Sequence, residues 1–189
     1  NEDAILPLKD GEKIVYIGEY VKAPRYQGGG SSHINPYKVT GIWEVVGEKE
    51  GTSYVKGYDL KAETIEKDAA VEAARGADKA VIFAGLPDSY ETEGIDRTNM
   101  DIPAYQNELI AAVAAAQPNT VVVLHNGSPV AMPWIDDVKG VLELYLGGEA
   151  VGLAAADLLY GKVNPSGRLT ETFPIRIEDT PTYPYYGVE

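Results

Sequence analysis

The chain has 189 residues, enough for one domain with a sizeable buried core and too few for two domains of ordinary size. Hydrophobic residues make up 44% of it and charged residues 24%, the balance of a globular rather than a disordered protein. The net charge of −13 disfavours nucleic acids and anionic membranes as partners, because their phosphates would be repelled.

Cysteine is absent, which excludes a disulfide framework and a thiolate metal site. Histidine occurs only at His33 and His125, so a histidine-built metal site is not expected either, and we predict neither a metal nor a cofactor. No apolar run approaches the ~18 residues of a membrane span. No signal peptide opens the chain, which favours a cytoplasmic location without assigning one.

The hydrophobic pattern predicts strands and helices in alternation along the chain. The predicted strands cover residues 13–18, 53–58, 79–85, 120–126 and 140–146, and the predicted helices cover 34–48, 64–77, 102–117 and 149–161. In the first helix, Asn35 is the expected N-cap and Pro36 the first helical residue. Continuous apolar strands such as "VVVL" are typical of a parallel sheet covered on both faces. We therefore predict a three-layer α/β sandwich with right-handed crossovers.

The periodicity ends after Gly161. Residues 1–161 are therefore predicted to form the α/β domain. Residues 162–189 are rich in proline and are predicted to form an irregular tail or linker that closes the domain.

Two of the strand-to-helix connections are long, residues 19–35 and residues 86–102. Long connections inside a compact domain usually carry function. In a parallel sheet such loops emerge beyond the carboxyl ends of the strands, where ligands bind. We therefore expect both loops at the same end of the sheet, beyond the carboxyl ends of its strands, and a functional site between them.

The first long loop contains the stretch "RYQGGGSSH". Its glycines match neither G-x-G-x-x-G nor G-x-x-x-x-G-K-[ST], the two common nucleotide-binding motifs. They are interpreted as a flexible loop or, alternatively, as a ligand cradle. The polar residues of this stretch could bind sugar hydroxyls or bond to their own turns. The candidate substrate-binding residues are Arg25, Gln27, Ser31, Ser32 and His33.

The second long loop contains the stretch "SYETEGIDR", with Glu91 and Glu93 two residues apart. Its carboxylates are either a solvated acidic turn or part of a glycoside-hydrolysing site, where one carboxyl protonates the leaving oxygen and another attacks or activates water. Asp96 and Arg97 are predicted to support the loop, through an ion pair or a turn. Ser128 is not in a G-x-S-x-G elbow, so a serine hydrolase is not expected.

Several stretches together resemble a known family. "RYQGGGSSHINP", "ETEGIDR", "VVVLHNGSPVAMPW" and "GGEAVGLAAADLLYGKVNPSGRLTETFP" resemble the second domain of glycoside hydrolase family 3 β-glucosidases. The resemblance runs over nearly the whole chain, and its motifs are specific because they occur together in this order.

The resemblance implies that the α/β sandwich packs against a (β/α)8 barrel of the same enzyme, which supplies the nucleophilic aspartate and most of the sugar pocket. It implies a five- to six-stranded, mostly parallel sheet, the sixth strand being antiparallel and contributed by the tail. It also implies that the loop "ETEGIDR" supplies the general acid/base of a retaining, exo-acting β-glucosidase. Glu93, directly before glycine, fits this role best, and Glu91 is the alternative.

The chain departs from the family in lacking the barrel and any match to the nucleophile's motif. Three functions stay open. The first is an acid/base-bearing part of a β-glucosidase that acts on a β-glucoside or oligosaccharide, with the isolated chain inactive. The second is a non-catalytic carbohydrate-binding or interaction module. The third is a structural domain that supports the barrel and mediates homo-oligomerisation. The preferred sugar is not readable from this chain.

Overall fold

The computed structural model describes residues 1–187 and centres on one parallel sheet of five strands. Along the sheet the order is β2 (Thr52–Val55), β1 (Ile14–Ile17), β5 (Lys79–Gly85), β6 (Thr120–His125) and β7 (Gly140–Glu143). Every residue of β1, β5 and β6 is buried, whereas β2 and β7 at the edges are partly exposed. The five predicted strands and the parallel arrangement are confirmed.

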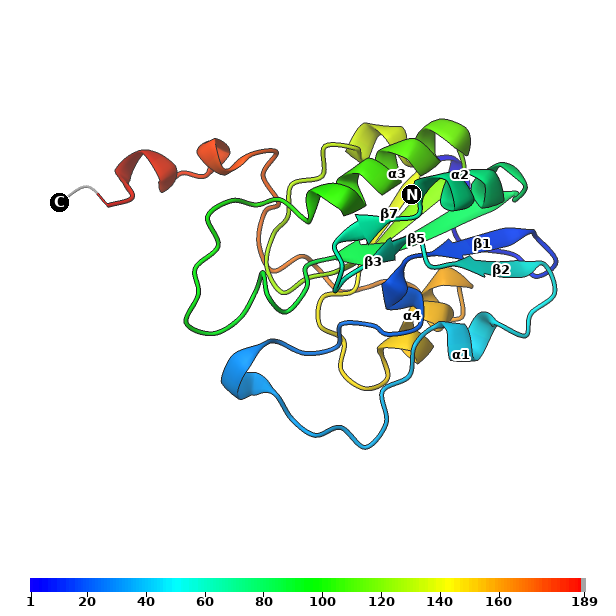
Figure 1. The fold of residues 1–189 in the computed structure, drawn as a ribbon, viewed down its shortest axis with the longest axis horizontal. Helices are drawn as coiled ribbons and strands as arrows, with labels where there is room; N and C mark the ends of the chain where they lie inside the picture. Colours follow the sequence, from blue (N-terminus) through cyan, green and yellow to red (C-terminus); the bar gives the residue numbers. More distant parts are fainter. Residues whose placement is uncertain (188–189) are drawn as a thin grey trace.

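Helices cover both faces of the sheet, as Figure 1 shows. Helices α2 (Lys67–Arg75) and α3 (Ala104–Ala116) pack together on one face, and α1 (Trp43–Val46) and α4 (Val151–Leu159) pack together on the other. Helix α3 follows Pro103 and ends before Pro118, and its many alanines favour the helix. Leu109, Ile110 and Val113 lie on its buried face, in the core. The predicted three-layer α/β sandwich is confirmed.

The predicted helix over residues 34–48 is wrong for most of its length, because only Trp43–Val46 is helical. Asn35 and Pro36 lie in an irregular segment and do not start a helix. The backbone that follows bonds to the start of α4 instead of to itself: the Thr40 N–H donates to Glu149 O at 2.9 Å, and the Gly152 N–H donates to Thr40 O at 3.0 Å. Tertiary hydrogen bonds therefore override the local helix signal.

Two further elements differ from the predicted pattern. A short antiparallel hairpin of β3 (Tyr58–Asp59) and β4 (Thr64–Ile65) precedes α2 and takes the first residues of the predicted second helix. The tail over residues 162–187 contains the 3₁₀ turns Ile177–Asp179 and Tyr183–Tyr185 but no strand, so the sixth strand is absent from the part of the tail that the structure describes. Its prolines, at 165, 174, 181 and 184, cannot donate to a sheet ladder.

Both long loops extend from the same end of the sheet, as predicted (Figure 1). The chain leaves β5 through Gly85, which has φ +142° and lies so close to β6 that a Cβ atom would be 2.1 Å from His125 O. Only glycine fits this turn, and it aims the second long loop across the ends of β1 and β6.

Within residues 1–187, no helix is both long enough and apolar enough to cross a membrane.

Candidate active site

Arg25 lies at the centre of the first long loop, and only 6% of its surface is exposed. Its guanidinium donates to Asp88 from Nε and to Leu86 O from Nη1, both at 3.0 Å, and to Glu91 O from Nη2 at 3.0 Å. Nη1 also contacts Glu91 Oε2 at 2.5 Å. The guanidinium therefore ties the first loop to the second, and a direct contact of Arg25 with substrate stays a prediction.

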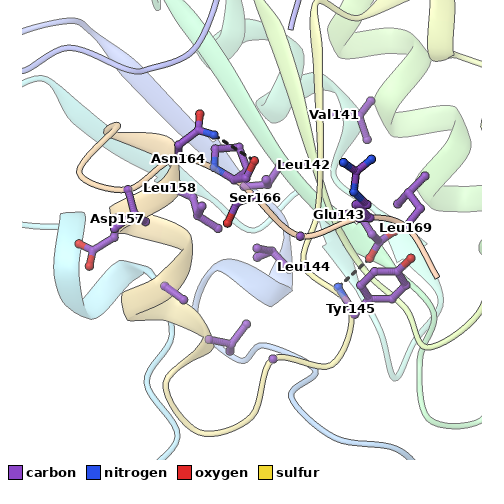
Figure 2. Close-up of a pocket in the computed structure, with 17 residues that line it drawn as sticks. Val141, Leu142, Glu143, Leu144, Tyr145, Asp157, Leu158, Asn164, Ser166 and Leu169 are labelled. Carbon is purple, nitrogen blue, oxygen red and sulfur yellow. Dashed lines mark hydrogen bonds between the residues drawn. The ribbon is translucent and has the colours of Figure 1, made fainter.

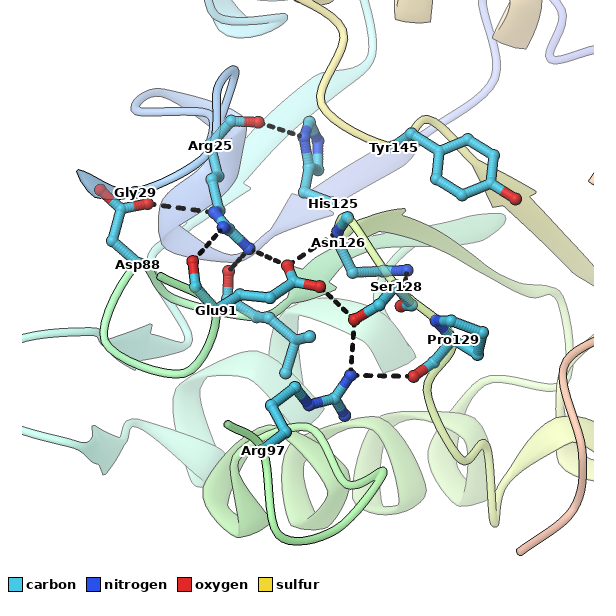
Figure 3. A network of polar contacts seen from close by, with 12 residues as sticks. Arg25, Gly29, Asp88, Glu91, Arg97, His125, Asn126, Ser128, Pro129 and Tyr145 are labelled. Atoms are coloured by element: carbon cyan, nitrogen blue, oxygen red, sulfur yellow. Dashed lines mark hydrogen bonds and ion pairs between the residues drawn. The ribbon is translucent and has the colours of Figure 1, made fainter. Parts of the chain in front are cut away.

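Glu91 points inward toward β6, and only 15% of its side chain is exposed. Besides Arg25, its carboxylate accepts hydrogen bonds from the Gly127 N–H at 2.8 Å and from the hydroxyl of Ser128 (Figure 3). Burial acts to raise the pKa of this carboxyl, but the bonds from Ser128, Gly127 and Arg25 outweigh burial and lower the pKa. Glu91 is therefore held as a carboxylate.

Glu93 points the other way and is exposed. Its carboxylate accepts hydrogen bonds from the Ser31 N–H at 3.0 Å and from the Ser31 hydroxyl, which lower its pKa. The first loop lies against it here, because a Cβ on Gly30, whose φ is +75°, would be 2.7 Å from Glu93 Cβ. Of the two glutamates of the motif, Glu93 is thus the accessible one.

Of the two predicted forms of support, an ion pair or a turn, the ion pair between Asp96 and Arg97 does not form, since Asp96 is exposed and Arg97 bonds elsewhere. Arg97 donates from Nη1 to the Ser128 hydroxyl at 2.8 Å and to Pro129 O at 3.0 Å. Arg97 does support the loop, but it does so by binding the loop after β6. Neighbours in sequence on an extended loop need not face one another, and in this fold the Arg97 guanidinium bonds to Ser128 and Pro129 instead.

Of the other candidate substrate-binding residues, Gln27 and Ser32 bond within their own loop, whereas His33 lies against the second loop. The Gln27 side chain accepts from the Ile34 N–H at 3.0 Å, and the Ser32 hydroxyl donates to Gly29 O at 3.0 Å. His33 Nε2 lies 3.5 Å from Asp88, and half of its side chain is exposed. Ser32 and His33 are exposed and Gln27 is half-buried, and sugar binding by all of them stays a prediction.

The sequence pattern did not single out Glu143, Asn126 or His125, which lie at the carboxyl ends of β7 and β6. Burial raises the pKa of Glu143 to about 7, although the Tyr145 N–H and the Asn126 side chain donate to it at 2.7 and 3.1 Å. Burial lowers the pKa of His125 to about 4, and its Nδ1 lies 3.1 Å from Arg25 O. The one available signal was a glutamate inside the apolar run "VLELYL".

A hollow of about 790 Å³ lies away from Glu93, between β7, α4 and the tail segment 163–169. Its walls are mainly apolar, from side chains such as Leu142, Leu158 and Leu169 (Figure 2). It arises because the tail crosses the edge strand without pairing with it. We do not assign the chemistry to this hollow.

The structure is thus a three-layer α/β sandwich with a carboxylate-bearing loop at the strand ends of its parallel sheet. The family model described as "Glycosyl hydrolase family 3 C-terminal domain" matches residues 1–188, and the chain belongs to this family.

Among curated proteins, the chain is 55% identical to thermostable beta-glucosidase B of Acetivibrio thermocellus, over 97% of this chain and 25% of that protein. It is 43% identical to exo-alpha-(1->6)-L-arabinopyranosidase of Bifidobacterium longum, over 96% of this chain and 26% of that protein. The chain thus spans about a quarter of the length of these relatives.

Among solved structures, the chain is similar to the GH3 beta-glucosidase of Bifidobacterium adolescentis, with a TM-score of 0.89 and 44% identity, over 100% of this chain and 28% of that one. The beta-glucosidase of Kluyveromyces marxianus in complex with glucose shares the fold, with a TM-score of 0.87 at 23% identity, over 97% of this chain and 41% of that one.

Proposed function

We propose that this domain is part of a retaining, exo-acting β-glucosidase that hydrolyses terminal β-D-glucosyl residues. In this proposal Glu93 is the general acid/base of an active site shared with a (β/α)8 barrel of the same enzyme. The barrel supplies the nucleophilic carboxylate and most of the sugar pocket. The proposal draws on membership of glycosyl hydrolase family 3 and on the names of the similar proteins.

One observation supports Glu93 over Glu91 as the acid. Glu93 is exposed at the sheet edge, whereas Glu91 is surrounded by the donors Arg25, Gly127 and Ser128. A general acid must reach the leaving oxygen and must carry a proton when the substrate binds. Glu91 is not placed to reach a leaving oxygen, because its donors occupy both of its carboxylate oxygens inside the fold.

The proposed reaction has two steps. In the first, the barrel carboxylate attacks the anomeric carbon while the bond to the leaving oxygen breaks, and Glu93 donates its proton to that oxygen. In the second, Glu93 as a carboxylate takes a proton from water, whose oxygen attacks the anomeric carbon and releases the nucleophile. One glutamate thus serves both steps and ends protonated, as it began.

For Glu93 to be an acid near neutral pH, its pKa must rise when the site is complete. Ser31 holds the pKa of Glu93 low in the domain described here. We propose that closure of the barrel over the loop removes water from Glu93 and places the nucleophile's negative charge near it. Both changes raise the pKa of a carboxyl.

The choice of sugar is proposed to lie mainly outside this domain. A beta-glucosidase and an arabinopyranosidase are both similar to this chain over almost its full length, at 55% and 43% identity. A domain shared by enzymes named for different sugars is not expected to determine the sugar specificity by itself. The proposal of β-glucose follows the nearer of these two relatives.

The test compares Glu93→Gln with Glu91→Gln in the full-length enzyme that carries this domain, on aryl β-glucosides with good and poor leaving groups. For Glu93→Gln we expect kcat/KM to fall by ~10²–10⁴-fold on poor leaving groups and far less on good ones, because good ones depart without a proton. Azide should rescue this variant on good leaving groups and give glucosyl azide, since azide needs no general base. Uniform losses across leaving groups, with no azide product, would show that the acid lies elsewhere.

A further inference from the structure

Three loops from different strand ends meet at the carboxylate of Glu91. Arg25 reaches it from the loop after β1, at 2.5 Å. The Gly127 N–H reaches it from the loop after β6, at 2.8 Å, and the Ser128 hydroxyl donates to its other oxygen. Glu91 itself belongs to the loop after β5 (Figure 3). One carboxylate therefore connects all three loops.

The network continues through Ser128 to Arg97, six residues beyond Glu91 on the same loop. Because the Ser128 hydroxyl gives its proton to Glu91, its lone pairs are free to accept from Arg97 Nη1, at 2.8 Å. Arg97 also donates to Pro129 O at 3.0 Å. Residues 91–97, which contain Glu93, are thus anchored at both ends.

The anchors are built to resist rearrangement. Arg25 makes a charge-assisted contact with Glu91 through a nearly buried guanidinium, which also donates to the Glu91 backbone. The side chains of Arg25 and Glu91 are 4% and 15% exposed, so water screens the pair only weakly. Removing the charge of Glu91 would leave the Arg25 cation without its closest partner inside the fold.

We propose that Glu91 is a positioning residue, whose contacts with Arg25, Gly127 and Ser128 hold residues 91–97 so that Glu93 can reach the leaving oxygen. This inference rests on the proposed role of Glu93 as the acid/base. Glu91 exchanges no proton with substrate and acts only through the placement of Glu93. The closely spaced glutamates of "ETEG" therefore have different tasks.

The test is a double-mutant cycle in the full-length enzyme, on an aryl β-glucoside with a poor leaving group. Glu91→Gln should lower kcat by about 10–100-fold with little change in KM, because a small displacement of the acid is costly. In the Glu93→Gln background, the same change should have no further effect beyond about twofold, because there is no acid left to position. Azide should give no glucosyl azide with Glu91→Gln alone.

Ser128→Ala provides a second route if Glu91→Gln folds poorly. It removes one anchor and leaves the charge pair intact, so a smaller loss in kcat is expected, again abolished in the Glu93→Gln background. Glu108→Gln is the matched control, because Glu108 forms an exposed ion pair with Lys67 at 2.7 Å, outside this network. It should leave kcat unchanged.

Backbone hydrogen exchange separates this inference from the proposed function. Amides of residues 91–97 should exchange faster in Glu91→Gln than in the wild type or in Glu108→Gln, whichever residue is the acid. Unchanged exchange there, or losses from the two glutamates that multiply, would overturn the positioning role. Glucosyl azide formed by Glu91→Gln would overturn it as well, and would make Glu91 the acid. Failure of Glu93→Gln to show the acid signature would overturn the proposed function alone.

Discussion

Ser31 donates two hydrogen bonds to the carboxylate of Glu93, one from its backbone N–H at 3.0 Å and one from its hydroxyl. The two residues lie on different loops, 62 positions apart in the sequence. The contact joins the glycine-rich loop after β1 to the acidic loop after β5. It also favours the ionised form of Glu93, so Ser31 bears on the chemistry proposed for this glutamate.

Ser31→Ala should move the alkaline limb of the kcat/KM profile to higher pH in the full-length enzyme. Removing the hydroxyl takes away a donor that stabilises the carboxylate, so the pKa of Glu93 rises and its acid form persists to higher pH. The backbone N–H remains, so the rise is partial. The measurement is kcat/KM against pH for an aryl β-glucoside.

Ser32→Ala is the control for this prediction. Its hydroxyl donates to Gly29 O and not to Glu93, although it belongs to the same loop. The alkaline limb should therefore stay where it is in this variant. A shift of equal size in both variants would mean that loop disturbance, and not the lost hydrogen bond, moves the profile.

Residues 1–189 alone should fold but should not hydrolyse aryl β-glucosides measurably. Apolar side chains fill the core from both faces of the sheet, but in the proposed mechanism the chain supplies only the acid and the barrel supplies the nucleophile. General acid catalysis alone contributes only ~10²–10⁴-fold. Circular dichroism would report folding, and release of nitrophenol would report activity. Substantial turnover by the isolated chain would place a nucleophile within it, contrary to the proposal.

Much of the fold could be predicted from the sequence because the central strands are buried on both faces. Strands β5 and β6 are continuous apolar runs that fit no exposed element. The segment 34–42 could not be predicted in the same way, because its hydrogen-bond partners are residues 149–152. Its proline and asparagine indicate a helix start only while those distant partners are unknown.

The site could be predicted only to the level of its loops. The lengths of the loops 19–35 and 86–102, and the rule for parallel sheets, place both at one edge. The opposite directions of Glu91 and Glu93 depend on Arg25, Gly127 and Ser128, which no local pattern links to the motif. The orientation of a loop side chain is decided by tertiary partners that spacing does not reveal.

Gly85→Ala should destabilise the domain by about 3 kcal/mol or more. Gly85 combines φ +142° with a backbone contact that would place the new Cβ 2.1 Å from His125 O, so β5 and β6 would have to separate. Gly94→Ala is the matched control, because Gly94 also has positive φ, +81°, but has open space around its Cβ position. It should cost only about 1–2 kcal/mol. Urea denaturation of both variants would measure the difference, and equal costs would show that the steric clash is relieved.

In the wild type, the free energy of unfolding should fall as pH rises toward neutral, and Glu143→Gln should remove the part of this fall that comes from Glu143. Burial raises the pKa of Glu143 to about 7 in the folded domain, against 4.5 for an ordinary glutamate. Between these values the folded state holds a proton that the unfolded state has released, so the free energy of unfolding falls as pH rises through this window. Glutamine does not titrate and should abolish this contribution, on the order of 2 kcal/mol between pH 5 and pH 8.

His125 titrates in the same range with the opposite sign, so the comparison must be made between variants. Its pKa is lowered from 6.5 to about 4, which means that the unfolded state binds the extra proton and stability falls as pH drops through that window. This contribution is present in both the wild type and Glu143→Gln and cancels in their difference. Urea denaturation of the two proteins at pH 5 and pH 8 therefore isolates Glu143. If the variant and the wild type change in parallel between the two pH values, Glu143 is ionised in the folded domain and burial does not control its titration.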